Sequence, residues 1–189
     1  MFPLTSDEKC LLLRLARQSL QAAVCGGTMN PLQDISTALA KPAGAFVTLH
    51  EQDALRGCVG FIAALKPLYQ TVIEAAAASA LHDTRFRPVT PDELATLKIE
   101  IYVLSDFCEA SLNRIQVGVH GVMVSRGNAR GLLLPQVAVE RKWTALRFLE
   151  ETCRKAGLPP GAWKQGAKIE LFTAEVFSER SLETPELPH

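Results

Sequence analysis

The chain has 189 residues, in which 20 lysines and arginines balance 20 aspartates and glutamates, with a pI near 6.9. This length is enough to bury the core of one domain or of two small lobes. The balanced charge argues against a general nucleic-acid-binding protein, which needs a basic stripe to neutralise phosphates, but it allows a small anionic ligand held by one or two arginines.

The first predicted element is a helix. Thr5 and Glu8 have the spacing of a capping box, in which the hydroxyl and the carboxylate accept hydrogen bonds from free backbone amides. Apolar residues recur at helical spacing after them, and the pair Gly26-Gly27 stops the helix. The segment 28–42 contains two prolines, so we expect an irregular connection there with room for one short helix.

A β-hairpin is expected next. Ala45–His50 and Leu55–Ile62 are rich in apolar and β-preferring residues, and the turn-forming sequence Glu51-Gln52-Asp53 lies between them. This pattern predicts two adjacent antiparallel strands. Pro67 suits the first turn of an alanine-rich helix that runs to about Leu81, because its missing amide proton is not needed there.

The C-terminal half is predicted to add further strands and helices. We expect a short helix that starts at Thr90-Pro91-Asp92-Glu93, strands at 99–104, 115–119, 122–125 and 131–134, helices at 135–140 and 144–156, and a final strand at 168–177. Strands and helices are segregated and the strand connections are hairpins. The pattern therefore favours an α+β fold with antiparallel sheets and flanking helices over a doubly wound parallel fold.

The sharpest candidate for chemistry is Cys58, which lies between Gly57 and Gly60 in the sequence LRGCVG. Glycine lets a backbone or a ligand approach closely, so both glycines are candidate substrate-binding positions. A nucleophilic cysteine needs a stabilised thiolate and partial exposure, and Arg56 is expected to help because it lies on the same strand face. The alternative is a structural thiol, since free cysteines are among the most buried residues.

Two histidines are candidate acid–base groups, because imidazole titrates near neutrality. His82 follows the alanine-rich helix, where it can equally cap the helix C-terminus. His120 precedes Gly121, and a tight turn explains it nearly as well as catalysis does. We assign no role to His50 or His189.

Three further side chains complete the candidate site. Arg85 can bind a carboxylate or phosphate in two-pronged geometry, although an internal ion pair with Asp83 is the simpler alternative. Gln136 and Glu140 are four residues apart in a predicted helix, so they share one face. Glu140 is a candidate general acid or base or an orienting group, although a solvated carboxylate is the commoner case.

Metal and cofactor sites are not indicated. Five cysteines are spread widely without a CxxC pair, and no histidine pair has ligand spacing. The chain contains neither a glycine-rich phosphate loop nor a dinucleotide fingerprint, and its one GxxG match lacks flanking basic residues. Free thiols are typical of a reducing compartment, so we expect a cytoplasmic protein; a signal peptide and a membrane-spanning run are not expected either.

Several ordered motifs resemble the AMMECR domain family, which is named after a chromosomal region for Alport syndrome, midface hypoplasia and elliptocytosis. They are LRGCVG, ASALHDTRFRPVTPDEL, the run Val117 to Val122, GLLLPQVAVE, Trp143, and the segment Lys155 to Pro159, and they extend over about Lys9 to Phe177. The resemblance implies a single domain with two lobes and a cleft between them. We place the larger lobe at about 1–26 and 88–189 and the smaller one at about 27–87.

The resemblance also implies a function. Bacterial and archaeal members are similar to one component of a set that includes a Memo-like and a radical-SAM-like protein, and an enzymatic role is suspected for the family. We expect a small cytoplasmic enzyme, a cysteine-dependent transferase or hydrolase of unassigned reaction, with Cys58 as the nucleophile and a small anionic substrate. The alternative is a non-catalytic adaptor that works with those two partners, and a weaker one is an RNA-associated module.

The enzyme hypothesis makes a geometric prediction, because acid–base and nucleophilic groups act only close to a common substrate. Cys58, Arg85 and His120 should line one pocket in the cleft. Gln136 and Glu140 should lie at its wall, and His82 at its rim.

Overall fold

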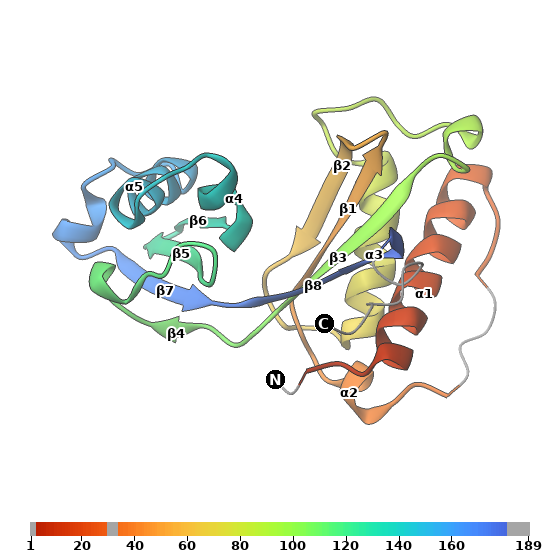
Figure 1. Ribbon diagram of the computed structural model, residues 1–189, viewed down its shortest axis with the longest axis horizontal. Helices are drawn as coiled ribbons and strands as arrows, with labels where there is room; N and C mark the ends of the chain where they lie inside the picture. Colours follow the sequence, from red (N-terminus) through yellow and green to blue (C-terminus); the bar gives the residue numbers. More distant parts are fainter. Residues whose placement is uncertain (1–2, 30–33, 181–189) are drawn as a thin grey trace, which may run out of the picture. The chain divides into compact units, whose positions relative to one another are not determined.

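The computed structural model describes residues 3–29 and 34–180, and its chain forms two compact units (Figure 1). Of the described residues, Ser105–Ala174 form one unit, and those up to Leu104 and from Glu175 to Arg180 form the other. The boundaries therefore fall elsewhere than at residues 26 and 87. The reason is that the segment 27–87 shares its core with the first helix, and the two do not separate into different lobes.

The unit formed by the described residues before Ser105 and after Ala174, called here the terminal unit, is a sheet covered by helices. Its elements are α1 (Ser6–Cys25), α2 (Thr37–Ala40), β1 (Ala45–Glu51), β2 (Ala54–Phe61), α3 (Leu68–Leu81), the 3-10 turn η1 (Pro91–Glu93), β3 (Lys98–Leu104) and β8 (Ala174–Ser178). The strand order is β2-β1-β3-β8, so β2 is an edge strand. The capping box of Thr5 and Glu8 is present, and Gly26 ends α1 with φ of 73°.

The predicted hairpin is confirmed. β1 and β2 pair antiparallel, with Val47 opposite Val59 and Thr48 opposite Cys58. β1 also pairs antiparallel with β3, which places Thr48 opposite Glu100. Side chains alternate between the faces of a strand, so Cys58, Thr48 and Glu100 form one row across three strands.

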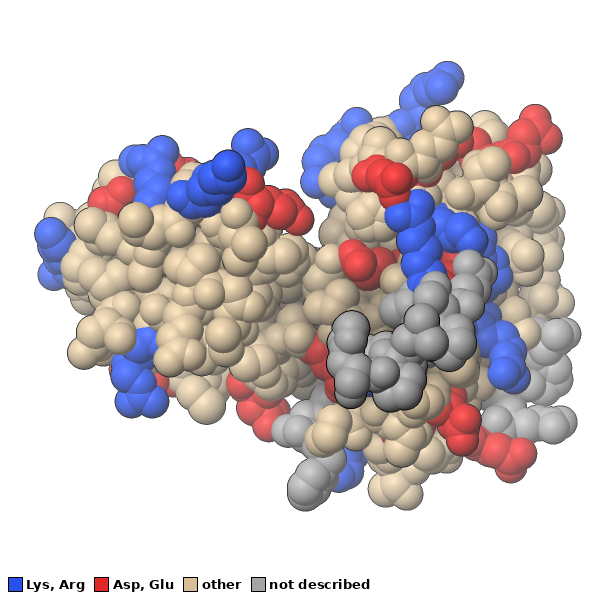
Figure 2. Space-filling view, viewed as in Figure 1, with Lys and Arg blue, Asp and Glu red and all other residues tan. Residues whose placement is uncertain are grey.

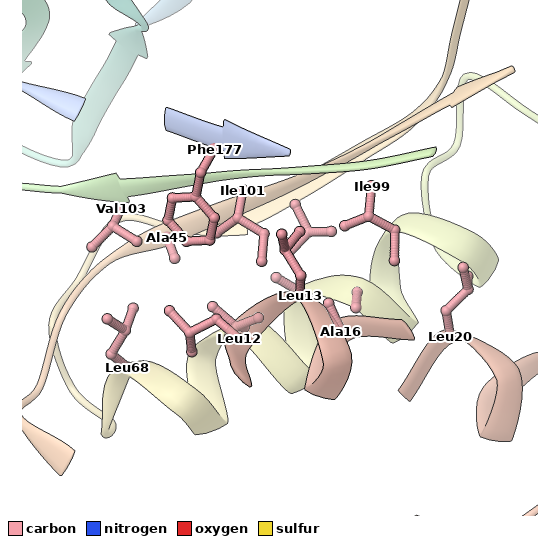
Figure 3. Packing of buried hydrophobic residues seen from close by; sticks show 14 of the residues in the cluster. Leu12, Leu13, Ala16, Leu20, Ala45, Leu68, Ile99, Ile101, Val103 and Phe177 are labelled. Atoms are coloured by element: carbon pink, nitrogen blue, oxygen red, sulfur yellow. The ribbon is translucent and has the colours of Figure 1, made fainter. Parts of the chain in front are cut away.

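The core of the terminal unit lies between the sheet and the two long helices (Figure 3). Apolar side chains of α1 and α3 pack against alternate residues of the strands. The helices contribute Leu12, Leu13, Ala16, Leu20 and Leu68, and the strands contribute Ala45, Ile99, Ile101, Val103 and Phe177. The row that contains Cys58 is therefore on the sheet face opposite α1 and α3. Among the described residues, no helix is both long enough and apolar enough to span a bilayer.

The second unit, Ser105–Ala174, has its own sheet and core. Its elements are β4 (Cys108–Glu109), η2 (Leu112–Arg114), β5 (Gly121–Arg126), β6 (Ala129–Leu133), α4 (Pro135–Glu140), α5 (Ala145–Lys155), η3 (Ala162–Gln165) and β7 (Lys168–Phe172). The strand order is β4-β7-β5-β6, and fully buried Phe148 and Leu149 of α5 pack on the sheet. Both sheets are antiparallel, which confirms the α+β class.

Two predicted strands are wrong. Residues 115–116 are irregular and 117–119 form a turn, because only Ile115 reaches the core whereas Val117 and Val119 are exposed, and Gly118 has φ of 85°. The predicted strand at 168–177 is two strands, β7 and β8, that join different sheets. The strand is interrupted at Thr173, whose amide donates a hydrogen bond to the hydroxyl of Ser105.

Candidate functional site

The thiol of Cys58 is half-buried in the middle of β2. The hydroxyl of Thr48, its cross-strand partner, donates a hydrogen bond to the Cys58 sulfur over 3.3 Å. Thr48 is only 5% exposed, so this hydroxyl is a fixed neighbour of the sulfur and not a solvated group.

A second set of contacts reaches Cys58 from the segment that follows α3. The carboxylate of Asp83 accepts hydrogen bonds from the amide of Cys58 at 2.8 Å and from Nη2 of Arg85 at 2.6 Å. It also accepts from Nε and the backbone amide of Arg85, at 2.9 and 3.2 Å. Nη2 of Arg85 in turn donates to the carbonyl of Cys58 at 3.2 Å. Asp83 and Arg85 therefore bind both backbone polar groups of Cys58.

Charge in this cluster is fixed at neutral pH. The hydrogen bonds from Arg85 lower the pKa of Asp83 to about 2, against the opposing effect of burial, and the Cys58 amide contributes further lowering. The pKa of Arg85 is raised, chiefly by Asp83 and to a lesser degree by interaction with the side chain of Cys58. The backbone of Cys58 is thus held by a permanent cation and by that cation's permanently charged partner.

The two glycines around Cys58 serve close packing. A Cβ on Gly57 would lie 2.3 Å from the carbonyl oxygen of Ser79 in α3, and one on Gly60 would lie 2.3 Å from the ring of Phe46. The hydroxyl of Ser79 also accepts a hydrogen bond from the amide of Val59 at 2.9 Å. The two contacts of Ser79 bring the end of α3 against β2, whereas Gly60 leaves room for the ring of Phe46 on β1. The expected part of the glycines in substrate binding stays a prediction.

Arg56 is engaged away from the sulfur. Its Nε and Nη2 donate to the two carboxylate oxygens of Glu93 at 2.7 and 3.1 Å, and its Nη1 donates to the carbonyl of Arg87 at 3.0 Å. Arg56 in turn lowers the pKa of Glu93 to about 2. Arg56 therefore ties β2 to η1, and the guanidinium that interacts with Cys58 is that of Arg85.

The remaining candidates were expected to join Cys58 from two parts of the chain. His82 is exposed, and its backbone amide caps the C-terminal end of α3 through the carbonyl of Ala78. His120, Gln136 and Glu140 belong to the second unit, where Gln136 is half-buried and Glu140 is exposed on α4. The structure describes each unit by itself, so the convergence of these residues with Cys58 stays a prediction.

The contacts of His120 define which of its nitrogens can act. Nδ1 accepts a hydrogen bond from the backbone amide of Gln116 at 3.1 Å, and the His120 amide donates to the Gln116 carbonyl at 2.9 Å. A neutral imidazole carries its proton on the nitrogen that does not accept. His120 therefore presents Nε2–H, a hydrogen-bond donor, whereas its basic nitrogen is occupied within the turn.

We expect nitrogen NMR to show this tautomer. At pH 8, Nδ1 of His120 should have the chemical shift of an unprotonated nitrogen and Nε2 that of a protonated one. The exposed His82 is the reference within the same chain, and its two nitrogens should show the averaging of mixed tautomers. Similar averaging at His120 would contradict the assignment.

Two residues of the cluster were not among our candidates. Thr48 has no chemical motif of its own, and it lies opposite Cys58 only because the ladder shifts register by one residue at a β-bulge between Leu49 and His50; the turn alone would pair Thr48 with Gly57. Asp83 appeared only as the partner of an ion pair. Its bond to the Cys58 amide depends on how α3 packs on β2, for which the sequence gives no local signal.

Figure 2 shows lysines and arginines interspersed with acidic residues over the face in view, without a continuous basic stripe. Among the residues that the structure describes, no group of three histidine, cysteine, aspartate or glutamate side chains is placed to hold a metal ion.

Comparison with known proteins gives a consistent result. The sequence model of the family described as AMMECR1 matches residues 13–177. Protein MK0488 of Methanopyrus kandleri is 40% identical over 193 residues, covering 96% of this chain and 93% of the relative. Protein PF1979 of Pyrococcus furiosus is 41% identical over 181 residues, covering 89% and 86%. The crystal structure of the uncharacterized protein PH0010 from Pyrococcus horikoshii, 39% identical, superposes with a TM-score of 0.85 over 93% of both chains.

Proposed function

This chain belongs to the AMMECR1 family, and from that premise we propose that it is a small cytoplasmic enzyme with Cys58 as a covalent nucleophile. The observation that carries the proposal is the arrangement of donors at Cys58. Thr48 donates to the sulfur, and the guanidinium of Arg85 donates to the backbone carbonyl of the same residue. Cations and hydrogen-bond donors near a cysteine favour the reactive thiolate.

The proposed chemistry is transfer of a group to the sulfur. The thiol proton passes to solvent, and the thiolate then forms a bond to an electrophilic carbon of the substrate. The leaving group departs from that carbon with its bonding electron pair, and Arg85 binds an anionic group of the substrate. Later attack by water would make the enzyme a hydrolase, and attack by another acceptor would make it a transferase.

Alkylation rates followed residue by residue test the nucleophile. At pH 7, iodoacetamide should modify Cys58 faster than the exposed Cys25 and Cys108, by about tenfold, although Cys58 is less accessible. Cys153 should react slowest, because burial raises its pKa and shields it. If Cys58 is modified no faster than Cys25, the proposal that Cys58 is the nucleophile is wrong.

Variants locate the cause of that reactivity. Thr48→Val and Arg85→Gln should each slow the modification of Cys58, because the first removes the donor to the sulfur and the second removes the cation bound to the carbonyl of the same residue. Arg87→Gln is the matched control, since it removes an exposed cation two residues from Arg85. A Cys58 rate that Arg85→Gln and Arg87→Gln change equally would point to general charge and not to the site.

The rival function is a non-catalytic adaptor that works with Memo-like and radical-SAM-like partners. Cys58→Ser separates the two, because an adaptor should keep its partners and its cellular role while an enzyme should lose activity and stay folded. We expect metabolite profiles of a Cys58→Ser strain to match those of a deletion strain. A Cys25→Ser strain should match the wild type; a wild-type profile in the Cys58→Ser strain would favour the adaptor.

A further inference from the structure

The backbone amide of the proposed nucleophile is already bound. In acyl-transfer sites, backbone amides at the nucleophile commonly stabilise the oxyanion that develops on the substrate. Here the amide of Cys58 donates to the buried carboxylate of Asp83 at 2.8 Å, and the side chain of Asp83 is only 6% exposed. An incoming carbonyl group would have to displace this carboxylate in order to use the amide.

The guanidinium of Arg85 has donors left over. Its Nε and Nη2 edge faces Asp83 in a two-pronged contact, and Nη2 also reaches the carbonyl of Cys58. Within the part of the chain that the structure describes, no hydrogen bond uses Nη1, and the side chain is 55% exposed. The guanidinium is rigid and planar, so fixing one edge fixes the direction of the remaining N–H groups.

We infer that Asp83 is a positioning residue that holds Arg85 beside Cys58, so that Nη1 of Arg85 and not the Cys58 amide receives the negative charge of the substrate. The inference rests on the proposed function and adds a substrate class to it. The favoured substrates carry a carboxylate or phosphate next to the electrophilic carbon. Neutral esters and amides, whose carbonyl oxygen needs a backbone donor at the nucleophile, are disfavoured.

A pair of reagents that differ in charge measures this selectivity. Iodoacetate and iodoacetamide have the same reactive carbon, and each forms a sulfur–carbon bond as iodide leaves with the bonding electron pair. Only iodoacetate carries a carboxylate next to that carbon. We expect the iodoacetate-to-iodoacetamide rate ratio at Cys58 to exceed the ratio at Cys25 about fivefold, the scale of one unit charge at roughly 4 Å in water.

Asp83→Ala distinguishes positioning from simple electrostatics by the sign of its effect. Loss of a negative charge beside the thiol should by itself raise the preference for iodoacetate. Loss of the group that holds Arg85 should instead lower it, and we expect the ratio at Cys58 to fall to that at Cys25. A ratio that rises or stays unchanged overturns the inference. Asp92→Ala, which removes an exposed carboxylate from η1, is the control and should leave the ratio unchanged.

A second variant and a folding measurement separate the loss of Arg85 positioning from a general loss of folding. Asp83→Asn keeps the volume of the buried side chain but not its charge, so it should lower the ratio in the same direction. Hydrogen exchange of the β1 and β3 amides shows whether each variant retains the sheet. If Cys58 of the wild type is no more reactive than Cys25, the proposed function fails. If Cys58 is reactive but the Asp83 variants keep its preference for iodoacetate, only the positioning role fails.

Discussion

Replacing Gly57 by alanine is expected to lower the free energy of unfolding of the terminal unit by about 3 kcal/mol, the upper end of the usual cost of overpacking. The new Cβ would lie 2.3 Å from the carbonyl oxygen of Ser79, which is backbone and cannot rotate away. The end of α3 could retreat only by breaking the hydrogen bonds of the Ser79 hydroxyl with the amide of Val59 and the carbonyl of Val47.

Gly27→Ala is the matched control in the same unit, because the nearest atom to its new Cβ is 3.8 Å away, an ordinary contact. Two compact units need not unfold together, so we would measure stability by hydrogen exchange of the β1 and β2 amides. If Gly57→Ala were as stable as Gly27→Ala, the close approach of α3 to β2 would be refuted as the reason for this glycine.

The same close approach explains why the sequence predicted the hairpin but not the site on it. Strand alternation, the turn at Gln52-Asp53 and the apolar content of both strands are local properties, and they suffice to pair β1 with β2. Packing of α3 on β2 is not local. It decides that Asp83 lies at the Cys58 amide, and the alanines of α3 indicated only that some close contact occurs.

Arg56 and Arg85 show the same limit. Two-residue spacing on a strand predicts that Arg56 and Cys58 share a face, and Arg56 was therefore expected to stabilise the thiolate. The structure shows a guanidinium engaged by Glu93, which is distant in sequence and is brought near by η1. A long side chain can reach several neighbours, so its partner depends on tertiary packing and not on strand alternation alone.

The wrong strand at 115–119 has a different cause. The sequence IQVGV alternates apolar and small or polar residues, which imitates the period of a half-buried strand. Gly118 adopts a left-handed conformation, and the imidazole of His120 accepts the amide of Gln116. A turn with its own hydrogen bonds thus replaces the ladder of a strand. The glycine and the histidine were visible in the sequence, but a bend was expected only at 120–121.

Acid is expected to destabilise the terminal unit through two carboxylates. Asp83 and Glu93 have pKa values lowered to about 2, by Arg85 and Arg56 respectively, from ordinary values of 3.8 and 4.5. A carboxylate with a lowered pKa in the folded state stabilises the fold above its unfolded pKa, and this stability is lost as the pH falls towards the folded value. We therefore expect losses between about pH 4.5 and 2, on the order of 2 kcal/mol for each group.

Removing one arginine should remove its share of this pH dependence. Arg56→Met deprives Glu93 of its two-pronged partner, so the variant should be about 2 kcal/mol less stable than the wild type at pH 6. At pH 2 the wild type has lost most of this advantage, because the pH has fallen to the lowered pKa of Glu93 and this carboxylate is about half protonated in the folded wild type, so the two stabilities should approach each other. Hydrogen exchange of the β2 amides measured from pH 6 down to pH 2 would follow this convergence.

Lys66→Met is the control for loss of a cation, because Lys66 pairs with Glu74 where both side chains are about half exposed, and such pairs contribute little. It should keep the full pH dependence of the wild type. A pH dependence unchanged by Arg56→Met would mean that Glu93 is not stabilised by this arginine. The anchoring of β2 to η1 would then have to come from the bonds of Arg56 to the carbonyls of Arg87 and Pro88, which do not titrate.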